Sequence, residues 1–162
     1  IFLRNQLTAD FLAKRLPKEH FTHEAHLRVA LWHLVRYSPP EALARLRAAI
    51  QTYNLANGGQ NTETSGYHET ITRFYVWLIG RFVNEMSLPG PTPSRDRQER
   101  GLDVDVDADL DLDALADVLV ARFGDRKLPL QYYSEDVLMS VEARLGWVTP
   151  DLAPMEQPPD WS

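Results

Sequence analysis

The most apolar segment of the chain, YHETITRFYVWLIGRFVNEM at 67–86, places the strongest constraint on its fold. Apolar side chains recur along it three or four residues apart, which is the periodicity of a helix. They are Ile71, Phe74, Tyr75, Leu78 and Phe82. Such a helix must bury its apolar face against other elements. Because no segment outside the aspartate run at 103–113 alternates as a strand does, we predict that these partners are helices too.

Helix start and stop signals divide the rest of the chain. The predicted N-caps are Thr8, Thr22, Ser134 and Ser140. The predicted breakers are Pro17, Ser38-Pro39-Pro40, Asn57-Gly58-Gly59 and Gly124. Between them we expect a short helix after Thr8, helices at about 23–37, 40–56 and 110–123, and short helical turns in the tail. The helix at 67–86 is expected to start after Ser65 or Gly66.

These elements predict one all-α domain over residues 1–162, a helical bundle with short turns at its C-terminus. The length and the apolar content of 44% are sufficient for a single core. Residues 88–109, which begin with the Pro-, Gly- and charge-rich LPGPTPSRDRQERG, are expected to form a mobile connector and an acidic segment. No repeat of about 20–50 residues is visible.

The chain contains no cysteine, which excludes disulfides, thiolate metal sites and a cysteine nucleophile. Any metal must therefore be held by His, Asp or Glu. No run reaches the roughly 18–20 apolar residues of a membrane span, and the lack of cysteine fits a reducing compartment. We therefore expect a cytoplasmic protein, although a removed targeting segment remains open because the sequence starts at Ile1.

The net charge of −6 comes from one short stretch, DVDVDADLDLD at 103–113, which holds six aspartates. Without them, 17 acidic residues balance 17 basic ones. No cluster of basic residues remains to bind a phosphate backbone, so neither nucleic acid nor a membrane is an expected partner.

The aspartate run has two interpretations. Alternating aspartates resemble a calcium-binding loop, but Ala108 or Leu110 stands where that loop needs glycine. Ala114 or Ala116 stands where it needs glutamate. We favour the second interpretation, in which the later aspartates cap the following helix and the earlier ones belong to a loop.

Four of the five histidines lie at 20–33, in HFTHEAHLRVALWH. His23 and His26 are three residues apart in the first turn after Thr22, so they share a face of the helix. The positive end of the helix dipole favours their neutral form, which can coordinate a metal. His33 lies roughly 15 Å farther along the axis and cannot join them, and the direction of His20 is not predictable.

The fifth histidine, His68, belongs to YHET at 67–70, and the helical stripe places it on a buried face with Glu69 beside it. If the helices at 23–37, 40–56 and 67–86 run up, down and up, the first and third start at the same end of the bundle. We therefore predict that His23, His26 and His68 converge, with Glu69 as a fourth ligand or general base.

Such a ligand set suits one divalent transition metal, Zn, Fe, Mn, Ni or Cu, that activates water or oxygen. The predicted catalytic residues are Glu69, Tyr67 and Arg73, and Thr70 and Arg28 are further candidates for contacts near the site. The hypothesis is a metal-dependent enzyme acting on a small organic molecule. Its reaction and oligomeric state are left open.

The alternative is a structural role for the same histidines. HEAH has its histidines three residues apart, whereas the zinc-protease motif needs four. Three histidines at one bundle end can form a polar network that fixes the fold of a non-catalytic ligand- or protein-binding module. A third possibility is a pH-responsive element.

Three segments, FTHEAHLRVALW at 21–32, YHETITR at 67–73, and YYSEDVLMSVEAR with VTPDL within 132–152, resemble a group of small, uncharacterised bacterial proteins. The resemblance covers most of the chain apart from about 88–109. It implies that the FTHEAHL and YHET segments form a unit, and it implies no particular activity.

Overall fold

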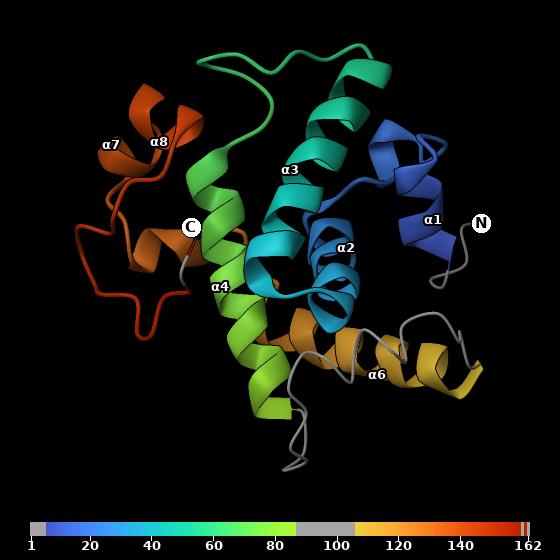
Figure 1. Cartoon of the computed structure of the whole chain (residues 1–162). Coiled ribbons are helices and arrows are strands. Elements are labelled where there is room, and N and C mark those ends of the chain that lie inside the picture. Colours follow the sequence, from blue (N-terminus) through green and yellow to red (C-terminus); the bar gives the residue numbers. More distant parts are fainter. Residues whose placement is uncertain (1–5, 87–105, 160, 162) are drawn as a thin grey trace.

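The computed structural model describes residues 6–86, 106–159 and 161, and the regular secondary structure of this part of the chain consists of helices, without a strand (Figure 1). The predicted all-α bundle is thus confirmed. The elements in chain order are α1 (Leu7–Leu12), η2 (Lys18–His20), α2 (His23–Arg36), α3 (Pro39–Ala56), α4 (Glu69–Met86), α6 (Val106–Phe123), η3 (Leu128–Gln131), α7 (Glu135–Leu138) and α8 (Val141–Leu145).

Helices α2, α3 and α4 pack against one another and form the centre of the bundle. α3 runs opposite to α2 and α4, and α6 crosses the end of the bundle beside α2 (Figure 1). α1 packs against α2 and α3, and Phe11 enters the main core from this side. The starts of α2 and α4 therefore face the same end, as the predicted topology requires.

Several predicted helix boundaries follow from local capping and are confirmed. Thr22 Oγ1 accepts a hydrogen bond from the Ala25 N–H, and Ser134 and Ser140 cap α7 and α8 in the same way. Pro39 and Pro40 occupy the first turn of α3, where a missing N–H costs no helical hydrogen bond.

Other boundaries differ from the prediction. Thr8 lies inside α1, which starts one residue earlier, so its prediction as an N-cap was wrong. α4 starts at Glu69 rather than near Tyr67, because the preceding residues bind tertiary partners described below. α6 starts at Val106, four residues before the expected Leu110, so 106–109 are helical and not part of a connector. The predicted connector up to 105 and the calcium interpretation of the aspartate run lie outside the described residues and side chains.

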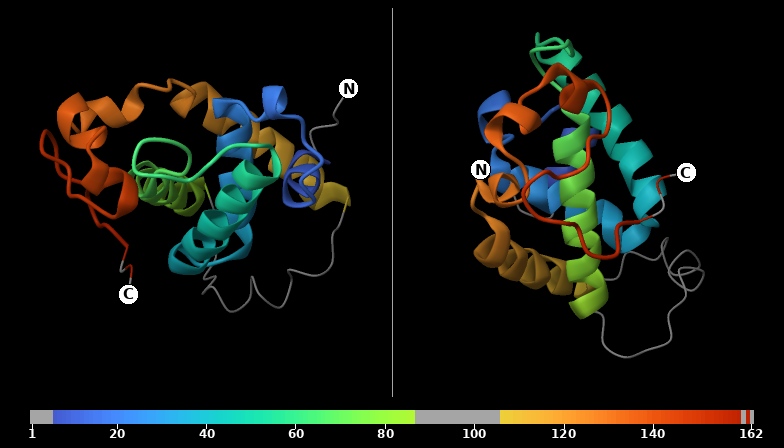
Figure 2. Two further views of the ribbon diagram at one scale, coloured as in Figure 1. Left: turned by 90° about the horizontal axis from the view of Figure 1, so that it is seen from above. Right: turned by 90° about the vertical axis from the view of Figure 1, so that its left-hand side faces the viewer.

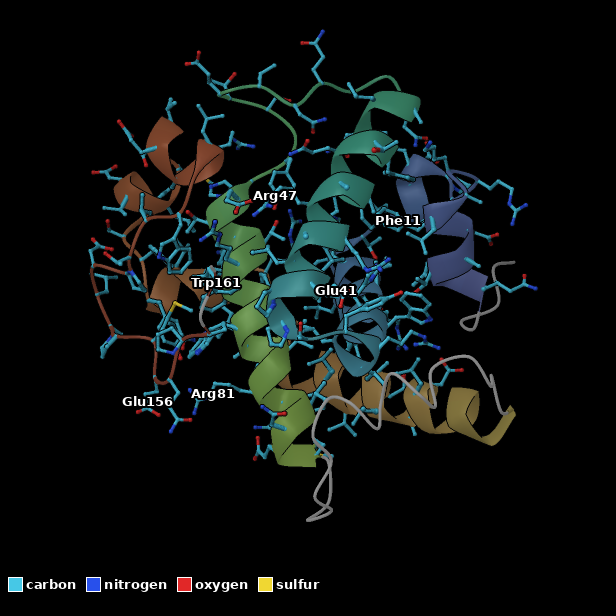
Figure 3. The ribbon with its side chains drawn as sticks, viewed as in Figure 1. Phe11, Glu41, Arg47, Arg81, Glu156 and Trp161 are labelled. Carbon is cyan, nitrogen blue, oxygen red and sulfur yellow. The ribbon has the colours of Figure 1, made fainter. Side chains whose placement is uncertain are left out.

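The C-terminal part of the chain packs along α4. α7 and α8 pack together near the first turn of α4, and residues 146–159 follow that helix along its length (Figure 2). Trp77 Nε1–H donates to the Glu156 carbonyl at 2.8 Å. Arg81 forms an ion pair with the Glu156 carboxylate at 3.4 Å, at the far end of this contact (Figure 3). The tail thus covers the face of α4 that points away from α2 and α3.

None of the helices in 6–86 and 106–159 combines the length and apolar content that a membrane crossing needs.

Candidate functional site

A cavity of about 760 Å³ lies between α2, α3 and α4 and is closed at one side by the residues that follow α6. This volume is in the range of small-molecule sites. Most of its wall is apolar, and the apolar lining consists of Phe21, Leu27, Val29, Ala30, Leu46, Ile50, Ile71 and Val76. The polar lining consists of Thr22, His23, Glu24, His26, Thr72, Tyr75 and Arg126. We call this space the central cavity.

The first turn of α2 presents His26 to the central cavity. Its ring stacks on Phe21 at a centroid distance of 3.7 Å, and its Nδ1–H donates to the Thr22 carbonyl at 2.8 Å. A carbonyl oxygen can only accept, so in the neutral ring the lone pair is on Nε2. The side chain of His26 is exposed, but its exposed surface lines the central cavity. The protein around this cavity desolvates the ring, which lowers the pKa of His26. His26 is therefore neutral at pH 7.

His23 and Tyr75 lie side by side on the same wall. Their rings make an edge-to-face contact with centroids 5.4 Å apart. Nε2 of His23 and the Tyr75 hydroxyl are both buried and have no hydrogen-bond partner among the residues that the structure describes. Desolvation lowers the pKa of His23 and raises that of Tyr75, so both side chains are neutral at pH 7. Unsatisfied buried polar atoms are uncommon in folded proteins, so each needs an explanation.

His68 has a different environment. It is buried, its Nε2–H donates to the Leu138 carbonyl at 2.7 Å, and its Nδ1 accepts from the Ile71 N–H at 3.1 Å. Since Ile71 lies three residues on, the imidazole acts as the N-cap of α4 in the way that Ser or Asp usually does. Both ring nitrogens are satisfied, so the ring has no free lone pair to offer a metal.

Glu69 is also buried and satisfied. Arg47 on α3, which is labelled in Figure 3, donates two hydrogen bonds of 2.8 and 2.6 Å to its carboxylate. Arg73 donates a further hydrogen bond at 2.6 Å, and the Tyr67 hydroxyl donates one at 2.7 Å. These donors outweigh desolvation and lower the pKa of Glu69 to about 2. A carboxylate with so low a pKa is a poor general base at neutral pH.

Thr70 of the YHET segment and Arg73, one turn later, connect α4 to the C-terminal tail. Thr70 Oγ1–H donates to the Gly146 carbonyl at 2.8 Å and accepts from the Val148 N–H at 3.2 Å. The Arg73 guanidinium lies 5.3 Å from the ring centre of Trp161, within cation–π range. YHET therefore joins α3, α4, α7 and the tail through buried, satisfied polar groups.

The predicted convergence of His23, His26 and His68 does not occur. No group of three or more His, Asp or Glu side chains in the described part of the chain is placed to hold a metal ion. The helices do start at the same end, but at different heights. His23 meets α4 at Tyr75, seven residues after His68, which is about 10 Å along the axis. His68 instead turns toward α7.

The remaining histidines and Arg28 lie elsewhere. His33 is buried and donates from Nδ1–H to the Val29 carbonyl at 2.8 Å. His20 is an exposed residue of η2. Arg28 is bound by Glu24 at 3.0 Å and Asp117 at 2.6 Å, which ties α2 to α6.

Sequence reasoning missed the roles of Tyr75 and Arg126. Tyr75 falls on the apolar stripe of its helix, a position that predicts core packing, and nothing in the residues around it indicates that its hydroxyl lacks a partner. Arg126 follows the end of α6 in an exposed turn, far in sequence from the other lining residues. Only the tertiary fold brings it to the central cavity.

No protein-family model matches this chain, and no curated protein or solved structure is significantly similar to it.

Proposed function

We propose that this protein binds a small organic molecule in the central cavity. The observation that carries the proposal is the pair of unsatisfied polar atoms, His23 Nε2 and the Tyr75 hydroxyl, on side chains that line a largely apolar space. Each costs about 1–3 kcal/mol when it stays unpaired. A wall of apolar side chains with a few polar groups is the usual composition of a ligand site.

The FTHEAH segment supports this proposal better than the YHET segment does. His23 and His26 are neutral and line the cavity, whereas His68 and Glu69 are fully engaged with other parts of the protein. The FTHEAH segment thus faces the ligand, and the YHET segment holds the fold together. Separately, the lack of cysteine predicts a cytoplasmic location.

A cavity-filling substitution tests the proposal. The probes are 4-phenylbutanol, 1-octanol and cyclohexanol, and binding is followed by the amide NMR shifts of residues 21–30 and 71–76. Ala30→Leu adds three carbon atoms to the cavity wall, and we expect it to abolish these shifts while the far-UV circular dichroism stays unchanged. Ala44→Leu makes the same change at an exposed position of α3 and is the matched control. If no probe shifts these amides in the unmodified protein, the proposal is wrong.

Metal-dependent catalysis stays a second candidate, favoured by one observation: His23 and His26 are neutral imidazoles on the same cavity wall. The metal, its identity and the reaction are untested. Elemental analysis of protein purified without a histidine tag decides the question. If this candidate is right, a transition metal is present near one equivalent and His23→Ala/His26→Ala removes it. Less than about a tenth of an equivalent, with no rise in melting temperature on adding metal, contradicts it.

A further inference from the structure

Charged side chains of both signs lie at the rim of the central cavity. The positive charge of Arg126 contributes to lowering the pKa values of His23 and His26, whereas the negative charge of Asp125 opposes this at His23. Arg126 is exposed and forms no ion pair among the residues that the structure describes.

Glu24, which lines the same cavity as Arg126, and Asp125, its neighbour in the chain, already have partners. Glu24 is bound by Arg28 through both Nε and a terminal nitrogen, at 3.2 and 3.0 Å. Asp125 accepts the Lys127 N–H at 2.9 Å, which holds its carboxylate in the local turn. Arg126 is therefore the cation at this rim that a ligand meets without first displacing a protein carboxylate.

The polar groups inside the cavity also favour one type of ligand. The Tyr75 hydroxyl keeps its proton because burial raises its pKa, so it is a donor in need of an acceptor. The Thr72 hydroxyl already donates to the His68 carbonyl at 2.8 Å. A ligand with acceptor oxygens can accept hydrogen bonds from Tyr75 and Arg126. A ligand with an ammonium group is instead repelled by the positive charge of Arg126 at the rim.

We propose that the ligand of the central cavity is a monocarboxylate with an apolar body. The body packs among Leu27, Ile50 and Val76, and the carboxylate lies at the end where His23, Tyr75 and Arg126 gather. The carboxylate accepts hydrogen bonds from the guanidinium and the phenol, which are charge-assisted and therefore among the stronger ones in proteins. This inference rests on the proposed function, because it names the ligand class of the same cavity.

Three probes of equal shape test the inference: 4-phenylbutyrate, 4-phenylbutanol and 4-phenylbutylamine, titrated at pH 7.5 against the amide NMR shifts of residues 21–30, 71–76 and 124–126. We expect the acid to bind about tenfold more tightly than the alcohol, as for one charged hydrogen bond. We expect the amine to bind most weakly. Raising the salt concentration reduces the preference for the acid, because Arg126 is at the rim and is screened.

Two substitutions separate the charge from the cavity. Arg126→Gln removes the cation at an exposed position, and we expect the acid to fall to the affinity of the alcohol, whose own affinity stays unchanged. Lys127→Gln removes a neighbouring exposed cation that does not line the cavity and is expected to leave the preference intact.

The outcomes distinguish the two proposals. Equal binding of acid and alcohol to the unmodified protein, or an undiminished preference in Arg126→Gln, overturns the carboxylate inference and leaves the proposed function standing. The absence of shifts with all three probes overturns both.

Discussion

Replacing Glu69 with glutamine removes the charge that binds Arg47 of α3 at the start of α4 and leaves the shape of the side chain almost unchanged. Glu69 is 5% exposed, and its two carboxylate oxygens accept hydrogen bonds from Arg47, Arg73 and Tyr67. In Glu69→Gln, one of the two oxygens becomes an NH₂ group that faces a guanidinium, and the two cations lose the charge that they share.

The expected loss follows from the pKa of the carboxyl group. Its fall from 4.5 to about 2 corresponds to about 3 kcal/mol of stability at neutral pH. Breaking a buried ion pair from one side costs a similar amount, about 3–5 kcal/mol. For a protein of this size, 3 kcal/mol lowers the melting temperature by about 6–12 °C.

Urea unfolding at a series of pH values measures the effect. The stabilisation by Glu69 is fully present above the unfolded pKa of 4.5 and is lost as the pH falls toward 2. We therefore expect wild type and Glu69→Gln to differ by about 3 kcal/mol at pH 7 and to converge near pH 2. Glu41→Gln, which removes a half-exposed partner of Arg45 on α3, is the control and should cost less than about 1 kcal/mol. A loss below 1 kcal/mol for Glu69→Gln at pH 7 would refute the structural role of this carboxylate.

Three further predictions use the same unfolding assay. Tyr75→Phe removes an unpartnered buried hydroxyl. We expect it to leave the free energy of unfolding unchanged or to raise it by up to about 1 kcal/mol. A loss above 1 kcal/mol would mean that the hydroxyl has a partner in the free protein. Thr70→Val removes the hydroxyl that binds the tail at Gly146 and Val148. We expect the free energy of unfolding to fall by about 1–3 kcal/mol and proteolysis after residue 146 to become faster. An unchanged cleavage rate would contradict this. Desolvation lowers the pKa values of His23, His26, His33 and His68, so these histidines bind fewer protons in the folded than in the unfolded protein below pH 6.5. Stability should therefore fall from pH 7 to 5.5 even in Glu69→Gln, and a flat profile there would contradict their neutral state.

The parts of the fold that depend on local chemistry were predictable from the sequence. Thr22, Ser134 and Ser140 cap helices through hydrogen bonds that span three residues, so each cap is visible in a short stretch of sequence. The start of α4 was not, because His68 is an unusual cap whose ring also depends on Leu138, 70 residues away. Thr8 has the right side chain for a cap, yet α1 starts before it.

The candidate site shows the same division. The helical spacing placed His23 and His26 on one face, and both line the central cavity. Their convergence with His68 depends on how far α4 is shifted along its axis relative to α2. The periodicity of apolar residues contains no information about that shift. Arg73 lies one helical turn after Glu69, a spacing at which such side chains pair, whereas Arg47 lies 22 residues earlier on another helix.

The histidines that looked alike in sequence differ in how their nitrogens are satisfied, and this difference separates structure from function. A buried polar group with all its hydrogen bonds made stabilises the fold and has little left to offer a ligand. His68 is such a group, and so is the carboxylate of Glu69. His23 is the opposite case, since a buried nitrogen without a partner is a cost to the free protein that a ligand can relieve. Mutating His68 should therefore reduce stability first, whereas mutating His23 should reduce ligand affinity first.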